Sequence, residues 1–154
     1  MIEIEGYKNY AVSEDGKIFS LDYNRSGEVR ELSPKTVSTG YHCVGLYKDG
    51  KRKNFYVHRL VAQAFLDDYD PDLDVDHIDR NKINNHVSNL RIVTRSQNQQ
   101  NNNAKGVCFD KRHNKWYARL MVNYKCYCAP YRATEAEAIA DREELIQKYG
   151  TLPT

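Results

Sequence analysis

Short stretches of alternating apolar and polar residues fill the first third of the chain. They run from Tyr7 to Val12, Gly16 to Leu21, Tyr41 to Tyr47 and Lys53 to Val57, and glycine-containing turn sequences separate them. Alternation with a period of two turns one face of a segment toward a core, which is typical of half-buried strands. The pattern therefore predicts an antiparallel sheet in this part of the chain.

The apolar spacing becomes amphipathic in VHRLVAQAF, residues 57–65, which predicts a helix. A strand-like segment follows at residues 90–94. Thr94 and Gln97 fit a capping box, which places Asn98 in the first turn of a second helix. A hairpin packed on a helix, a ββα unit, is the predicted arrangement.

Residues 98–104 are almost all polar, so they cannot bury an apolar face, and we interpret them as a helix end and a linker. Beyond them, three strands are predicted over residues 106–109, 116–123 and 125–132. The last strand should be shortened or kinked at Pro130, because proline has no N–H to give to a strand ladder.

A final helix follows these strands. Thr134 and Glu137 form a second capping box, and apolar residues recur along the segment that Gly150 ends. The last third of the chain is thus predicted as a three-stranded sheet with one helix.

The composition of the chain mainly excludes classes of protein. A chain of 154 residues with 40% apolar content can form one compact domain or two or three very small ones. The four cysteines include no Cys-x2-Cys pair, and we interpret them as reduced thiols. No apolar run approaches the roughly 18 residues of a membrane span, so we expect a cytoplasmic protein without a membrane partner.

The net charge of +2 hides an uneven distribution. Residues 105–132 contain a single acidic residue, Asp110, and seven basic ones. Such a concentration predicts a face that binds a polyanion, although a solvated strand face is the alternative. The seven are Lys105, Lys111, Arg112, Lys115, Arg119, Lys125 and Arg132.

The candidate chemistry lies in VDHIDRNK, residues 75–82, and in two asparagines that follow it. Hydrolysis of a phosphodiester needs a base that works near neutral pH, and His77 is the candidate. Asp76 and Asn98 offer the oxygen ligands that a hard cation prefers. Asn89 can fix the imidazole, by its side chain or by shaping the loop. Taken alone, Asp76 and His77 are far more typical of a solvated turn than of an active site.

In this context the segment VHRLVAQAF…VDHIDRNKINNHVSNLRIVTRSQNQQN resembles the HNH endonucleases of phages and self-splicing introns, a branch of the ββα-metal nucleases. The resemblance implies that His77 is the general base and that Asn89 positions it. It also implies that Asp76 and Asn98 bind one divalent ion, Mg²⁺ or Mn²⁺. The family often has glycine where this chain has Arg80.

His58 begins the predicted helix of this segment, and we interpret it as a buried, hydrogen-bonded packing residue. Upstream, GYKNYAVSEDGKIFSL resembles the NUMOD4 module that often precedes HNH domains of this type. That resemblance covers residues 2 to about 50.

Downstream, GVCFDKRHNKWYARLMVNYKCY and TEAEAIADREELI resemble an AP2-type DNA-binding domain, whose sheet lies in the major groove. Packing beneath the helix is an equal alternative for the tryptophan of this segment. The residues that the resemblance implies in DNA contacts are Arg112, Lys115, Trp116, Arg119 and Lys125.

The sequence as a whole predicts an α+β protein with three modules: a NUMOD4-like β module (1–54), an HNH ββα-metal nuclease (55–103) and an AP2-like domain (104–154). The predicted function is that of a monomeric, homing-type endonuclease that hydrolyses double-stranded DNA with one divalent ion. A DNA-binding regulator without cleavage and a nuclease acting on RNA are the alternatives.

Overall fold

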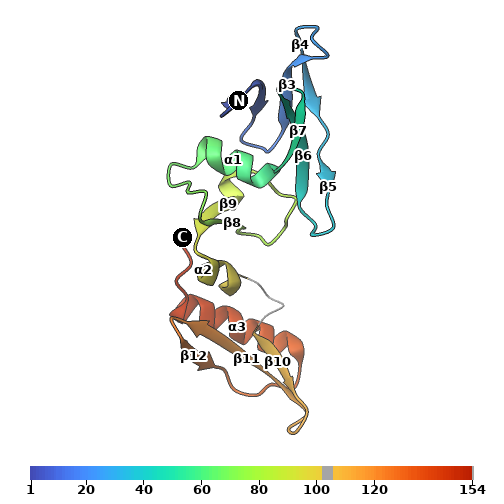
Figure 1. Cartoon of the computed structure of the whole chain (residues 1–154). Helices are drawn as coiled ribbons and strands as arrows, with labels where there is room; N and C mark the ends of the chain where they lie inside the picture. Colours follow the sequence, from blue (N-terminus) through green and yellow to red (C-terminus); the bar gives the residue numbers. More distant parts are fainter. Residues whose placement is uncertain (102–105, 154) are drawn as a thin grey trace. The chain divides into compact units, whose positions relative to one another are not determined.

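The computed structural model describes residues 1–101 and 106–153 of an α+β protein built from small antiparallel sheets and few helices (Figure 1). Two compact units make up the chain, Met1–Ile92 and Val93–Thr154. The predicted module boundary between residues 103 and 104 lies outside the described residues, and the three-module division stays a prediction.

The first unit begins with a four-stranded antiparallel sheet in the order β1-β2-β3-β4. Two of its strands confirm the alternating stretches predicted from the sequence. The other two were not predicted, because one has three residues and the other is almost entirely exposed. The strands are β1 (Ile2–Ile4), β2 (Tyr7–Val12), β3 (Ile18–Tyr23) and β4 (Glu28–Leu32).

A second sheet of the first unit has the order β5-β6-β7, with β5 (Lys35–Thr36), β6 (His42–Lys48) and β7 (Lys51–Tyr56). Asp49 and Gly50 both have positive φ, of 51° and 75°, between β6 and β7. This backbone suits a two-residue hairpin turn. The predicted strands at residues 41–47 and 53–57 are confirmed within one or two residues at each end.

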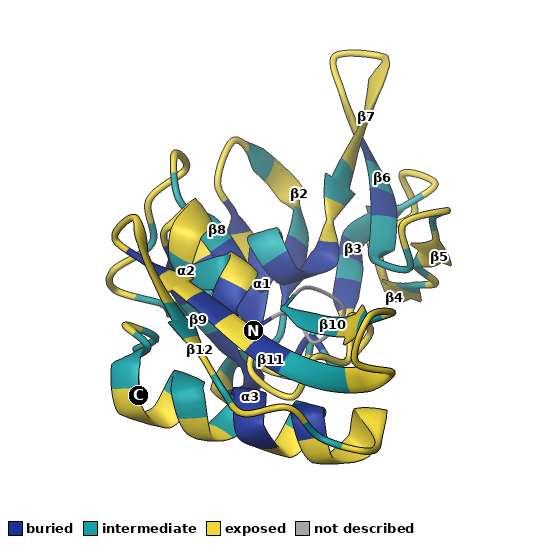
Figure 2. Ribbon diagram, turned by 90° about the horizontal axis from the view of Figure 1, so that it is seen from below, coloured by how far each residue is buried: buried dark blue, intermediate teal, exposed yellow. Residues whose placement is uncertain are grey.

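Helix α1 (Val57–Phe65) continues directly from β7 and supplies much of the core of the first unit. Its buried side is the predicted apolar stripe, seen in dark blue in Figure 2. Burial of this stripe against the strands stabilises both. The core residues are Ile4, Val12, Ile18, Val44, Leu46, Val57, Leu60, Val61, Ala62, Val75, Leu90 and Ile92.

The predicted ββ hairpin is formed by β8 (Asp74–His77) and β9 (Leu90–Val93), which pair in a two-stranded sheet. A loop and a short 3₁₀ helix, η1 (Val87–Asn89), connect the strands. Because Val75 and Leu90 belong to the main core, the hairpin is anchored, and the loop that follows His77 is held at both ends.

The second unit opens with α2 (Arg95–Gln100), whose predicted Thr94–Gln97 capping box is present. The sheet β10-β11-β12 is antiparallel, with β10 (Val107–Asp110), β11 (Lys115–Val122) and β12 (Lys125–Cys128). The predicted shortening before Pro130 is confirmed.

Helix α3 (Glu135–Tyr149) has the predicted cap at Thr134 and ends at Gly150. It covers the face of the sheet to which the buried residues Ala118, Leu120 and Val122 belong (Figure 2). The opposite face of the sheet, to which Lys115 and Arg119 belong, is called the open face below. Within the described ranges, no helix has the length and apolar character needed to cross a membrane.

Candidate active site

His77 lies at the end of β8 with only 4% of its surface exposed. Its ring centroid lies 5.8 Å from that of Tyr41 and 5.1 Å from that of His58. Its Nε2 atom lies 3.1 Å from Oδ1 of Asn85, a residue of the loop between β8 and β9. The predicted base is therefore held between aromatic rings and an amide.

Asn89 acts on the backbone around His77. Its Oδ1 accepts from the N–H of Asp79 at 3.0 Å, and its Nδ2 donates to Asp79 Oδ1 and to the carbonyl of Asn84, both at 2.9 Å. Its own carbonyl accepts from the N–H of Ile78 at 2.9 Å. Of the two ways in which Asn89 could fix the histidine, these contacts support shaping of the loop.

The turn just after His77 is tight. The N–H of Arg80 donates to the His77 carbonyl at 2.9 Å, and Arg80 has φ of 64°, in the left-handed region that glycine adopts most easily. This backbone explains how glycine can serve at the same position in the family. Hydrogen bonds from Asn84, the Asn81 backbone and Asn89 lower the pKa of the Asp79 carboxyl, so the turn keeps its negative charge.

Asp76 precedes His77 and is buried. Its Oδ2 accepts from Nε of Arg91 at 2.9 Å and lies 2.8 Å from a terminal guanidinium nitrogen of the same side chain. Arg91 belongs to β9, the strand paired with β8. Sequence reasoning missed this residue, although pairing of the two predicted strands was the signal that could have found it.

Asn98 lies in α2 and therefore in the second unit. Its N–H donates to the carbonyl of Thr94 at 2.9 Å, as expected in the first turn of a capped helix. The predicted sharing of one ion with Asp76 stays a prediction.

The chemistry of the donor set fits a hard cation, because a carboxylate and an amide oxygen are ligands that Mg²⁺ accepts. Among the residues that the structure describes, no three His, Cys, Asp or Glu side chains gather as a metal cluster. A cation held by a carboxylate and an amide oxygen usually retains several waters when it is Mg²⁺.

His58 is buried in α1, as predicted, and its ring also lies 4.9 Å from Tyr41. Burial, followed by the neighbouring His77 and Arg59, lowers its pKa to about 3. Its Nδ1 has no hydrogen-bond partner among the described residues, so the predicted hydrogen bond is not seen at this atom. A neutral His58 places no positive charge beside His77.

The predicted DNA-contact residues divide between the two faces of the C-terminal sheet. Lys115 and Arg119 are exposed on the open face. Trp116 shares the other face with the residues that α3 buries, as in the packing alternative. Lys125 pairs with Val122 and lies over the ring of Tyr127, so it also belongs to the helix-covered side. Arg112 is exposed in the β10–β11 turn.

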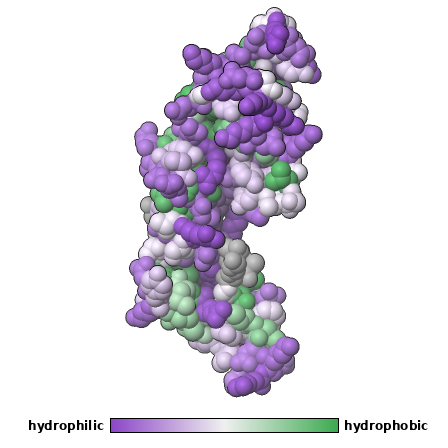
Figure 3. Space-filling view, in the orientation of Figure 1, coloured by the Kyte–Doolittle hydropathy of each residue, from purple (hydrophilic) through white to green (hydrophobic). Residues whose placement is uncertain are grey.

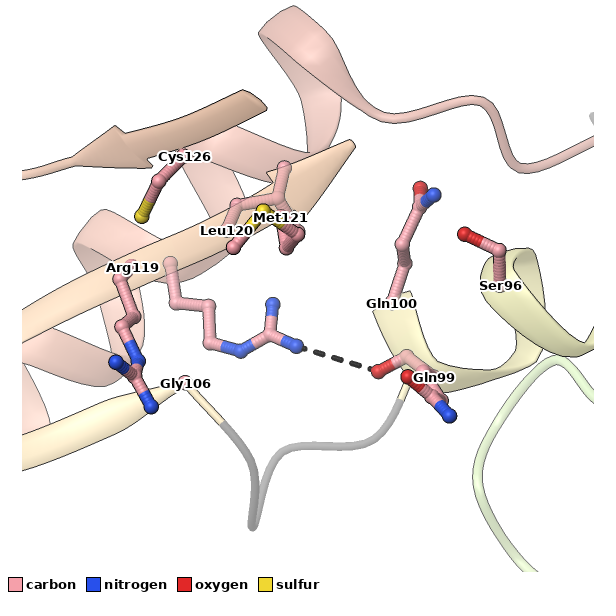
Figure 4. Close-up of a pocket in the computed structure, with 9 residues that line it drawn as sticks. Ser96, Gln99, Gln100, Gly106, Arg119, Leu120, Met121 and Cys126 are labelled. Atoms are coloured by element: carbon pink, nitrogen blue, oxygen red, sulfur yellow. Dashed lines mark hydrogen bonds between the residues drawn. The ribbon is translucent and has the colours of Figure 1, made fainter. Parts of the chain in front are cut away.

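A pocket of about 290 Å³ in the second unit is lined by α2, the sheet and α3 (Figure 4). Arg142 of α3 donates to the carbonyl of Gln99 at 3.4 Å, the dashed contact in the figure. Gln97 and Gln100 of α2 bond to Thr151, with the Thr151 N–H donating to Gln100 Oε1 at 2.9 Å. The helix that carries Asn98 is thus packed within the C-terminal unit.

The chain is similar in sequence to known HNH endonucleases. The family model described as HNH endonuclease matches residues 55–100, and the NUMOD4 motif matches residues 2–47. DNA endonuclease I-HmuI of Bacillus phage SP01 is 44% identical over 106 residues, which are 68% of this chain and 58% of that protein. H-N-H endonuclease F-TflI of Escherichia phage T5 is 30% identical over 114 residues, 72% of this chain and 56% of that protein.

A solved structure that concerns DNA binding and cleavage by the HNH homing endonuclease I-HmuI aligns with a TM-score of 0.58 at 45% sequence identity. The alignment covers 64% of this chain and 55% of that one. The chain thus spans little more than half the length of these relatives. The predicted resemblances to HNH endonucleases and to NUMOD4 are confirmed, and the AP2-like assignment of the C-terminal unit stays a prediction.

Proposed function

We propose that this chain is a homing-type endonuclease that hydrolyses phosphodiester bonds in double-stranded DNA, acting as a monomer with one divalent metal ion. The observation that carries the proposal is the buried Asp76–His77 pair at the end of β8, in the segment that matches the HNH endonuclease family. A turn of solvated residues, the alternative for this pair, would not bury both side chains.

In this reaction His77 takes the proton of the water that attacks the phosphorus atom. The bond to the 3′ oxygen breaks, which leaves 5′-phosphate and 3′-hydroxyl ends. Asp76 and Asn98 would hold the ion, Mg²⁺ or Mn²⁺, which supplies positive charge for the developing charge on the phosphate and the leaving oxygen. Arg91 fixes the carboxylate of Asp76 in one orientation.

The C-terminal unit would bind DNA through its open face, in the manner of an AP2-like domain. Lys115 and Arg119 stand exposed there, and Arg112 lies at the adjoining turn. Cations on a strand face suit contacts with phosphates and base edges in a major groove. Lys125 and Trp116 belong to the other side, so we assign them smaller parts in binding.

Cleavage assays with three substrates test the proposal. The full chain with Mg²⁺ is expected to cut double-stranded DNA faster than single-stranded DNA or RNA of the same sequence. Faster cleavage of RNA would instead favour the RNA-processing alternative. Binding of duplex DNA without cutting of any substrate would favour a DNA-binding regulator.

A further inference from the structure

We infer that Asn85 is a positioning residue for His77, and that the β2–β3 turn of the N-terminal sheet holds Asn85 in place. The role of Asn85 in catalysis rests on the proposed function. The contacts that hold Asn85 and His77 together lie within the first unit and do not depend on it. It gives the N-terminal sheet a direct part in building the active site.

The orientation of the Asn85 amide is set by two hydrogen bonds. Its Nδ2 donates to the carbonyl of Ile83 at 3.3 Å, so its Oδ1 is the atom that faces Nε2 of His77 at 3.1 Å. An amide oxygen only accepts hydrogen bonds, and therefore Nε2 must carry the proton. In a neutral imidazole the other nitrogen, Nδ1, is then the basic one. The amide thus selects which nitrogen can act as the base.

Burial makes this contact selective. Asn85 is 5% exposed and His77 is 4% exposed, so water competes poorly for either group. A buried donor that loses its acceptor keeps the full cost of its desolvation. The Nε2-protonated ring is therefore favoured here over the Nδ1-protonated ring, which would leave two acceptors facing each other.

The β2–β3 turn lies directly against Asn85. Gly16 in this turn has φ of 82°, and a Cβ atom there would lie 2.7 Å from Cβ of Asn85 and 3.2 Å from its carbonyl oxygen. The carbonyl of Glu14 accepts from the N–H of Val87, two residues after Asn85, at 2.8 Å. Only a glycine leaves the space that this close approach of turn and loop requires.

NMR of the ring N–H protons in the full chain tests the contact without metal or substrate. The wild type is expected to show a hydrogen-bonded Nε2–H signal of His77, assigned by its absence in His77→Ala. Asn85→Ala should remove this signal or shift it upfield, whereas Asn85→Asp keeps an acceptor oxygen and should retain it. A wild-type ring protonated at Nδ1, or an unchanged signal in Asn85→Ala, would overturn the inference.

Two glycine substitutions test the support from the turn. Gly16→Ala should weaken the Nε2–H signal, because the new Cβ collides with Asn85. Gly27→Ala is the matched control: Gly27 has a similar φ of 74°, but a Cβ there meets nothing within 4 Å. The two variants therefore share the backbone strain and differ in the collision. Equal signals in the two folded variants would show that the turn does not position Asn85.

Cleavage assays then connect the contact to catalysis. Asn85→Ala is expected to lower kcat by about 10-fold to 100-fold with little change in DNA affinity, and Asn85→Asp should recover part of the loss. A chain that shows the expected ring signals but cuts no nucleic acid would refute the proposed function and leave the contact standing. If the chain cleaves DNA but its Nε2–H signal is the same in the wild type and in Asn85→Ala, only the inference about Asn85 is refuted.

Discussion

At the scale of single residues, the proposed reaction depends on His77 as the base. We expect His77→Ala to reduce the rate of DNA cleavage by about 10²–10⁴, because a general base contributes this much to rate. DNA affinity should change little. His42→Ala, which removes a histidine from β6 in the same unit, is the control and should cut like the wild type. Nearly normal cleavage by His77→Ala would remove this residue from the mechanism.

His58 predicts a pH dependence of stability. Its pKa is about 3 in the folded chain and about 6.5 when unfolded, so below pH 6.5 the unfolded state binds a proton that the folded state does not. Folding stability must therefore fall as the pH drops from 6.5 toward 3.

The expected loss between pH 7.5 and 5.5 is about 1.4 kcal/mol, measured by denaturant unfolding. The His58→Phe variant has no imidazole at this position to titrate. Its free energy of unfolding should therefore fall by about 1.4 kcal/mol less over the same pH range. The same pH response in both proteins would mean that His58 is protonated in the folded state.

Asp76 and His77 could be named as candidates from the sequence, because the chemistry specifies the residue type, and their roles stay predictions. Their partners were missed. Asn85 reaches the site through the path of a loop, and Arg91 through the pairing of two predicted strands, which was the signal that could have found it. The sequence contains several asparagines in this loop, and nothing in their spacing tells which one faces the imidazole.

At the scale of elements, we expect the cap of α2 to affect the Mg²⁺ concentration that cleavage requires. The helix has six residues, too few to be stable without its cap and its packing. Thr94→Ala removes the side-chain oxygen that accepts from the N–H of Gln97, which costs about 1 kcal/mol. If Asn98 binds the ion, the Mg²⁺ concentration for half-maximal cleavage should rise, by up to about fivefold.

Thr94→Ser keeps the cap oxygen and should need no more Mg²⁺ than the wild type. A further control is Thr134→Ala, which removes the equivalent cap from α3, far along the chain from any predicted ligand. An unchanged Mg²⁺ requirement in Thr94→Ala, with a measurable loss of stability, would argue against Asn98 as a ligand.

Elements with strong local signals were predicted well, since capping boxes and two-residue periods are properties of neighbouring residues. Strands β1, β4 and β5 were missed because they are short or exposed, and only pairing with a neighbour makes them strands. The placement of α2 in the C-terminal unit was also beyond the sequence. It depends on bonds from Gln97 and Gln100 to Thr151, more than fifty residues away.

At the scale of the whole molecule, the surface of the first unit in Figure 3 is mostly hydrophilic. Binding of DNA therefore depends on where the positive charges lie. We expect the double substitution Lys115→Ala and Arg119→Ala to weaken binding of duplex DNA. The slope of log K against log salt should flatten by roughly 0.9 for each phosphate that the variant no longer neutralises.

Lys148→Ala is a control for the loss of a positive charge elsewhere in the second unit, because this lysine lies in α3, on the helical side. Its affinity and salt slope should stay close to those of the wild type. If the double variant and Lys148→Ala both keep the wild-type slope of log K against log salt, the open face does not bind phosphates.

The central claim is tested most directly by mapping the ends that the full chain produces in double-stranded DNA of its own source genome. We predict discrete cuts with 5′-phosphate and 3′-hydroxyl ends in Mg²⁺, no cuts in a chelator, and none with His77→Ala. Cuts that persist in the chelator, or that His77→Ala makes equally well, would contradict a metal-dependent reaction with His77 as its base.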